Sequence, residues 1–92
     1  MKFARDDYKA AANFRKHGVS FGEAESVFDD PLAVTTDDRQ HSEQEPREII
    51  IGHSEKGRLL FICFVERMGV VRLISARQAT RQERKEYENN FD

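Results

Sequence analysis

The chain has 92 residues, of which 38% are hydrophobic and 35% are charged, and its formal net charge is −2. This length is enough for a single domain, residues 1–92, with a modest core. The small negative charge argues against non-specific binding of nucleic acid by the whole chain. No signal peptide is visible, and the longest apolar run, residues 59–65, is too short to cross a bilayer. We therefore expect a cytoplasmic protein with no membrane partner.

The charges are unevenly distributed along the sequence. Residues 1–46 carry 6 Lys and Arg against 10 Asp and Glu, whereas residues 47–92 carry 9 against 7. A local basic site in the second half can therefore bind RNA, while the acidic first half offers a docking surface to a basic partner. The single cysteine, Cys63, lies within the apolar run and is interpreted as a buried thiol in a reducing compartment.

Two helices are expected near the N-terminus. The first covers residues 6–16, because Asp6 and Asp7 favour a helix start, residues 10–12 are all alanine, and Gly18 favours a helix end. The second begins at a capping box between Ser20 and Glu23 and continues to about residue 28, just before the Asp-Asp-Pro sequence at 29–31. Its apolar residues recur at helical spacing and should face the core: Phe21, Ala24 and Phe28.

After residue 31 the pattern changes to short β-strands. Four are expected, at residues 32–36, 47–52, 59–65 and 70–75, with a polar exposed loop at 37–46. The third is apolar on both faces and should be the central strand. A last helix follows a second capping box, Thr80 to Glu83, and depends on Tyr87 and Phe91 for its anchorage. The predicted fold is α+β, with two N-terminal helices, a four-stranded antiparallel sheet and a C-terminal helix.

Three arginines lie where the last strand runs into the last helix: Arg72, Arg77 and Arg81. Arg72 interrupts an apolar run, where a charge is costly unless an anion or a partner compensates it. If the strand registers agree, Arg47 and Arg72 converge near one rim of the sheet, with Arg77 just beyond. Such a set would stabilise the phosphorane that forms when an RNA 2′-hydroxyl attacks its own phosphate. The alternative is that these arginines pair with nearby glutamates and only stabilise the fold.

Other side chains carry weaker signals. Lys16 and His17 precede a helix-ending glycine, where an imidazole could act as a general acid or base, but Lys and His are also common there as helix caps. Tyr87 could stack on a base, although a tyrosine in a helix is more often a core residue. His41 and His53 lie in a loop and a turn. No metal-ligand spacing and no cofactor-binding motif occurs, so we expect neither a metal nor a cofactor.

Two blocks of sequence match a known family. They are Lys16-His17-Gly18-Val19-Ser20-Phe21 and Arg72-Leu73-Ile74-Ser75-Ala76-Arg77-Gln78-Ala79, supported in order by residues 13–15, 23–24, 27–31, 38–39, 47, 51–52, 83–84 and 87. On these residues the chain resembles the BrnT-type toxins of bacterial type II toxin–antitoxin pairs. One departure lies near the start. The family often has Trp-Asp-Pro-x-Lys, where this chain has Arg5-Asp6-Asp7-Tyr8-Lys9.

The resemblance implies a RelE-like ribonuclease fold, RNA cleavage that arrests translation, and a cognate BrnA-like antitoxin that binds DNA and can form a higher-order complex with the toxin. We expect metal-independent cleavage of RNA that leaves a 2′,3′-cyclic phosphate and a 5′-hydroxyl. The candidate catalytic residues are Arg47, Arg72, Arg77 and His17, and the candidate RNA-binding residues are Lys16, Arg81 and Tyr87. The rival hypothesis is a non-catalytic binding module that partners a DNA-binding repressor.

Overall fold

The structure, a computed structural model, describes residues 1–38 and 46–91. In chain order its elements are β1 (Lys2–Ala4), α1 (Asp7–His17), α2 (Phe21–Ser26), the 3-10 turn η1 (Val27–Asp29), β2 (Val34–Asp37), β3 (Arg47–His53), β4 (Leu59–Arg67), β5 (Val70–Gln78) and α3 (Arg81–Asn89). Most of the predicted loop, with His41, lies outside the described residues. No helix in the described part of the chain is long and apolar enough to span a membrane.

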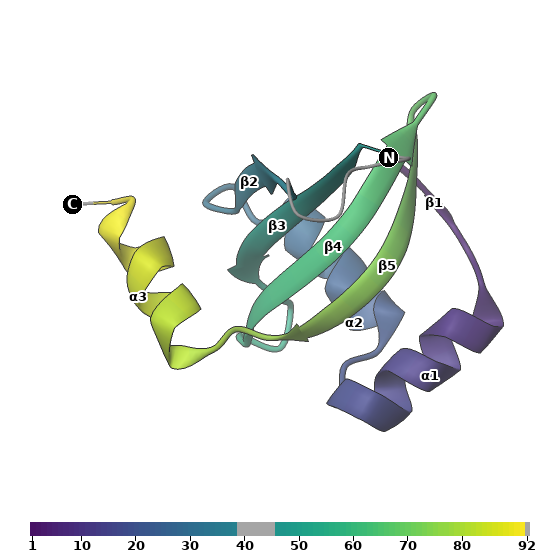
Figure 1. The fold of residues 1–92 in the computed structure, drawn as a ribbon, viewed down its shortest axis with the longest axis horizontal. Coiled ribbons are helices and arrows are strands. Elements are labelled where there is room, and N and C mark those ends of the chain that lie inside the picture. Colours follow the sequence, from purple (N-terminus) through teal and green to yellow (C-terminus); the bar gives the residue numbers. More distant parts are fainter. Residues whose placement is uncertain (39–45, 92) are drawn as a thin grey trace.

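The five strands form one mixed sheet in the order β1-β5-β4-β3-β2 (Figure 1). The four strands predicted from the sequence pair antiparallel, with β4 in the centre as expected. The prediction of a purely antiparallel four-stranded sheet is wrong, because β1 adds a fifth strand parallel to β5. β1 has only three residues, and its partner begins at Val70, so neither alternation nor a hairpin turn indicates it in the sequence.

Helices α1 and α2 lie behind one face of the sheet, while α3 projects from the far end of β5 (Figure 1). The core lies between α2 and the sheet, where Leu60 and Ile62 of β4 are fully buried with Ala24 and Val27. Alternation directs the other side chains of the strands to the opposite face, which the two N-terminal helices leave uncovered. We call this the open face, and its side chains include Arg47, Ile49 and Ile51 of β3, Phe61, Cys63 and Val65 of β4, and Arg72, Ser75 and Arg77 of β5.

Helix α1 is fixed to the sheet by a polar side chain. The helix starts at its Asp6 cap and ends at Gly18, whose φ of +70° is the left-handed conformation expected at this position. Asn13, its one buried residue, donates to the carbonyls of Ala76 (2.8 Å) and Val19 (2.9 Å) and accepts from the Ala76 N–H (3.0 Å). Because β1 pairs only with the start of β5, Asn13 takes the place of a neighbouring strand farther along that edge.

The capping box predicted at the start of α2 is only half formed. Ser20 Oγ accepts from the Glu23 N–H at 3.0 Å, but the Glu23 carboxylate does not return to Ser20. It binds the guanidinium of Arg58 and accepts from the Ser54 hydroxyl at 2.7 Å. Glu23 is 2% exposed, and a buried carboxylate is stable only with such partners. The side chain therefore ties α2 to the turn between β3 and β4.

Candidate active site on the open face

The strand register brings two of the candidate arginines to the same level of the open face. Arg47 of β3 and Arg72 of β5 both pair with Val65 of the central strand β4. Their backbones are therefore two strand spacings apart, about 10 Å, and their side chains leave the sheet on the same side. A single anion above Val65 is within the span of two such long cationic side chains.

Arg77 shares this face because of a β-bulge. Five positions separate it from Arg72, so strict alternation would direct the two side chains to opposite faces. Two adjacent residues of β4 pair with Leu73 and Ser75, which leaves Ile74 between them as an extra residue. Because of this extra residue, the side chain of Arg77 lies on the open face, like that of Arg72. Arg77 then lies four residues along β4 from the Val65 level, about 13 Å away.

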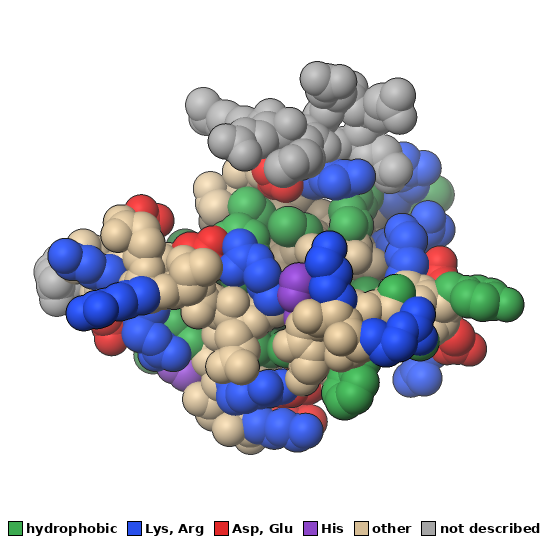
Figure 2. Space-filling model, turned by 60° about the horizontal axis from the view of Figure 1, so that its bottom comes forward, with side chains coloured by type: hydrophobic (Ala, Val, Ile, Leu, Met, Phe, Trp, Pro, Cys, Tyr) green, Lys and Arg blue, Asp and Glu red, His purple; other side chains and the backbone are tan. Residues whose placement is uncertain are grey.

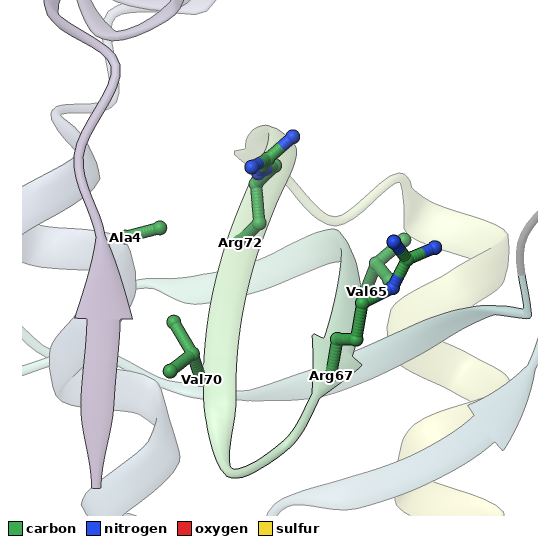
Figure 3. A pocket seen from close by; sticks show the side chains of 5 residues that line it. All are labelled: Ala4, Val65, Arg67, Val70 and Arg72. Carbon is green, nitrogen blue, oxygen red and sulfur yellow. The ribbon is translucent and has the colours of Figure 1, made fainter.

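A hollow of about 180 Å³ lies beside Arg72, lined also by Ala4, Val65, Arg67 and Val70. The side chains of Arg72 and Arg67 extend to the same side of the sheet, one from β5 and one from β4 (Figure 3). Arg72 is exposed, and no hydrogen bond or ion pair within residues 1–38 and 46–91 engages its guanidinium. The sequence reasoning missed Arg67, although it stands two positions after Val65 and the same alternation places it on this face.

Arg77 has a carboxylate partner. Its guanidinium forms two hydrogen bonds with Glu83 of α3, at 2.7 and 2.9 Å, and its Cζ lies 4.2 Å from the centre of the Phe61 ring. The paired guanidinium lowers the pKa of Glu83, and Glu83 raises the pKa of Arg77. Glu83 also accepts from the Thr80 N–H as part of the predicted capping box. The alternative interpretation, an ion pair that stabilises the fold, therefore describes Arg77 but not Arg72.

A second basic hollow lies at the edge of β5. It has a volume of about 240 Å³ and lies between one stripe of α1 and the bulge of β5, where its lining includes Lys9, Lys16, His17, Ile74 and Ser75. Ser75 also belongs to the open face, so the hollow adjoins that face at the edge of the sheet. Lys and Arg side chains are prominent on the side of the molecule shown in Figure 2, with hydrophobic side chains between them. Lys16 and His17 therefore lie beside β5, the strand that carries Arg72. This proximity is needed if all three residues contribute to one site.

The remaining candidates lie away from this cluster. Tyr87 is 6% exposed, its hydroxyl donates to the Leu32 carbonyl at 3.4 Å, and its ring packs edge-on against His53 and Phe91. Tyr87 is therefore a core residue, which was the alternative to base stacking in the sequence analysis. Arg81 is exposed in the first turn of α3.

Neither a metal site nor a reactive thiol is indicated in the described chain. Among residues 1–38 and 46–91, no three His, Cys, Asp or Glu side chains are grouped so that they could hold a metal ion. Burial raises the pKa of the Cys63 thiol, which keeps it protonated and weakly nucleophilic. The groups available for chemistry are therefore the guanidiniums and hydroxyls of the open face and the imidazole of His17 in the hollow at the edge of β5.

Comparison with known proteins gives two similarities. The family model described as "Ribonuclease toxin, BrnT, of type II toxin-antitoxin system" matches residues 6–83. Among solved structures, the fold is similar to that of the Brucella abortus ribonuclease toxin BrnT, with a TM-score of 0.67 and 23% sequence identity over 88% of this chain and 99% of that chain. No curated protein matches the chain.

Proposed function

The chain belongs to the BrnT family of ribonuclease toxins from type II toxin–antitoxin systems, and from this we propose that it is a metal-independent endoribonuclease that inhibits translation in the cytoplasm and is neutralised by a cognate antitoxin. The observation that carries the proposal is the exposed Arg72, which has no carboxylate partner among the described residues and stands level with Arg47 on the open face. An unpaired guanidinium beside a hollow is suited to bind a phosphate.

The proposed reaction needs charge stabilisation more than any other contribution. The RNA 2′-hydroxyl attacks the adjacent phosphorus, the bond to the 5′-oxygen of the next nucleotide breaks, and a 2′,3′-cyclic phosphate and a 5′-hydroxyl result. Arg72 and Arg47 would bind the non-bridging oxygens and stabilise the additional negative charge of the phosphorane. Fixed guanidiniums can do this without a metal ion, because they remain protonated throughout.

The other candidates would act around this pair. We assign proton transfer to His17 and contact with the neighbouring RNA backbone to Lys16, because both line the hollow that adjoins the open face. Arg77 and the exposed Arg81 would contact phosphates farther along the strand, where Glu83 already balances the charge of Arg77. The buried Tyr87 would support α3 rather than stack on a base.

The direct test is RNA cleavage by the purified protein in the presence of EDTA. Wild-type protein should cut single-stranded RNA and leave cyclic phosphate ends, and Arg72→Ala should lower the single-turnover rate by about 100-fold or more. His17→Gln should lower the single-turnover rate as well. Dependence of the wild type on magnesium would contradict the metal-independent mechanism.

The rival function, a binding module without catalysis, gives the opposite result in the same experiment. RNA would remain intact, and expression of the wild type would not arrest growth. If instead the wild type is toxic and the double substitution Arg72→Ala, Arg77→Ala relieves toxicity while the purified variant remains folded, the ribonuclease proposal is supported.

The antitoxin would neutralise the toxin by covering the open face. A BrnA-like, DNA-binding partner with an acidic or amphipathic segment fits the basic arginines there, and the pair could assemble into a higher-order complex. Arg72→Glu should weaken this contact without breaking an ion pair within the described chain. Unchanged affinity of the variant for the antitoxin would refute this position of the contact.

A further inference from the structure

An apolar stripe of α1 faces away from the protein core. Ala10, Ala11 and Phe14 recur at the spacing that places side chains on one face of a helix, and the charged Asp7 lies at the N-terminal end of the same face. In most surface helices this face is buried, yet the one buried side chain of α1 is the polar Asn13. Phe14 is 56% exposed. The helix therefore presents this stripe outward, and the groove beside it is a different hollow from the one that Lys16 and His17 line.

This stripe forms one wall of a groove between α1 and α2. The groove has a volume of about 440 Å³, and its apolar lining consists of Ala4, Ala10, Ala11 and Phe14 on one side and Phe21 of α2 on the other, next to Gly22. Alanine and glycine leave space for the close approach of another backbone, and two aromatic rings provide apolar contact. Such a shape fits the apolar side of an amphipathic helix.

The charges at the groove indicate which kind of helix fits. Three carboxylates line it, those of Asp6, Asp7 and Glu25, against the single cation Arg5. They belong to the acidic half of the chain, where residues 1–46 carry 10 Asp and Glu against 6 Lys and Arg. A partner with Lys or Arg beside its apolar ridge would satisfy these charges, whereas a second copy of the same groove would repel them.

We propose that the α1–α2 groove is the docking site of a basic amphipathic helix from a partner protein. The site is separate from RNA cleavage, since none of the arginines of the open face lines it. That the partner is the antitoxin rests on the proposed function. In that case two segments of opposite charge hold the toxin, an acidic one at the open face and a basic one at this groove.

The test uses two labelled synthetic helices of about 18 residues with the same leucine stripe, one with Lys and the other with Glu at the flanking positions. Fluorescence anisotropy should show that the basic helix binds wild-type protein at least about tenfold more tightly than the acidic helix. Ala11→Lys should weaken binding of the basic helix by at least about tenfold, and Ala11→Glu should weaken it less. Both substitutions retain good helix formers at an exposed position, so circular dichroism should be unchanged.

Several outcomes would overturn the docking proposal. If the two helices bind equally, if neither binds, or if the acidic helix binds more tightly, the groove does not select a basic helix. Sedimentation that reports a dimer of the wild type and a monomer of Ala11→Lys would assign the groove to a second copy. RNA cleavage, measured on the same Ala11→Lys sample, should match the wild type. If wild-type protein binds the basic helix but cuts no RNA, the ribonuclease proposal fails while the docking site stands.

Discussion

Two arginines of the same strand have different surroundings and should respond differently to substitution. Arg77→Ala leaves Glu83 without its guanidinium and removes the contact with Phe61, so it should lower the free energy of unfolding by about 1–2 kcal/mol. Arg72→Ala breaks no hydrogen bond or ion pair within the described residues and should change stability little while it impairs cleavage. Urea unfolding and single-turnover RNA cleavage, measured on both variants, separate the two roles.

Arg77→Lys is the matched control for this comparison, because it retains the charge but loses the planar fork that holds both Glu83 oxygens. It should be intermediate in stability between the wild type and Arg77→Ala. If Arg77→Ala abolishes cleavage without loss of stability, Arg77 rather than Arg72 is the central phosphate ligand.

At the scale of elements, the attachment of α1 depends on Asn13. Asn13→Ala would leave three buried backbone groups of Val19 and Ala76 without a partner, since within residues 1–38 and 46–91 no other strand pairs with this edge of β5 at that point. We expect a loss of about 2–4 kcal/mol in the free energy of unfolding, measured by urea denaturation. Asn89→Ala, at an exposed position of the same residue type, should stay within about 0.5 kcal/mol of the wild type.

Elements with local determinants could be predicted from the sequence, and those that depend on distant partners could not. The helices and the strands β3 to β5 have their own caps, turns and periodicity, and the alternation of residues on either side of Arg47 and Arg72 was enough to propose their shared face. Strand β1 is too short to carry a pattern and owes its existence to β5. The side chain of Glu23 likewise leaves its expected local cap for a partner 35 residues away, Arg58.

Some features of the candidate site could also be predicted from local sequence, while others depend on distant residues. Alternation predicts the side of the sheet for each arginine only as far as the strand is regular, and the extra residue Ile74 is visible only in the pairing of β4 with β5. Whether Arg77 meets an acid depends on the direction in which α3 leaves the strand. That direction brings Glu83 to Arg77, whereas Arg72 lies near the start of β5, away from α3, and is exposed. The sequence could therefore offer both interpretations of the arginines without deciding between them.

At the scale of the whole molecule, two carboxylates connect separate parts of the fold. Glu23 joins α2 to the β3–β4 turn through Arg58, and Glu83 joins α3 to the sheet through Arg77. The partner guanidinium holds the pKa of each carboxyl below the ordinary value of 4.5. A carboxyl with a lowered pKa in the folded state stabilises the protein above the unfolded value. This contribution is lost as the pH falls through the lower, folded value.

The protein should therefore lose stability progressively below about pH 4.5, even though its apolar core is unaffected by acid. Glu23→Gln and Glu83→Gln should each lower stability at pH 7 and reduce the slope of stability against pH below about pH 4.5, with the larger effect for Glu23, which is only 2% exposed. Glu88→Gln, at an exposed position of α3, is the control and should leave that slope as it is. Urea titrations at a series of pH values measure the slope. If the slope of the Glu23→Gln variant equals that of the wild type, other groups cause the acid sensitivity, because a carboxyl that stabilises only in its charged form must leave the pH dependence when it is replaced by an amide.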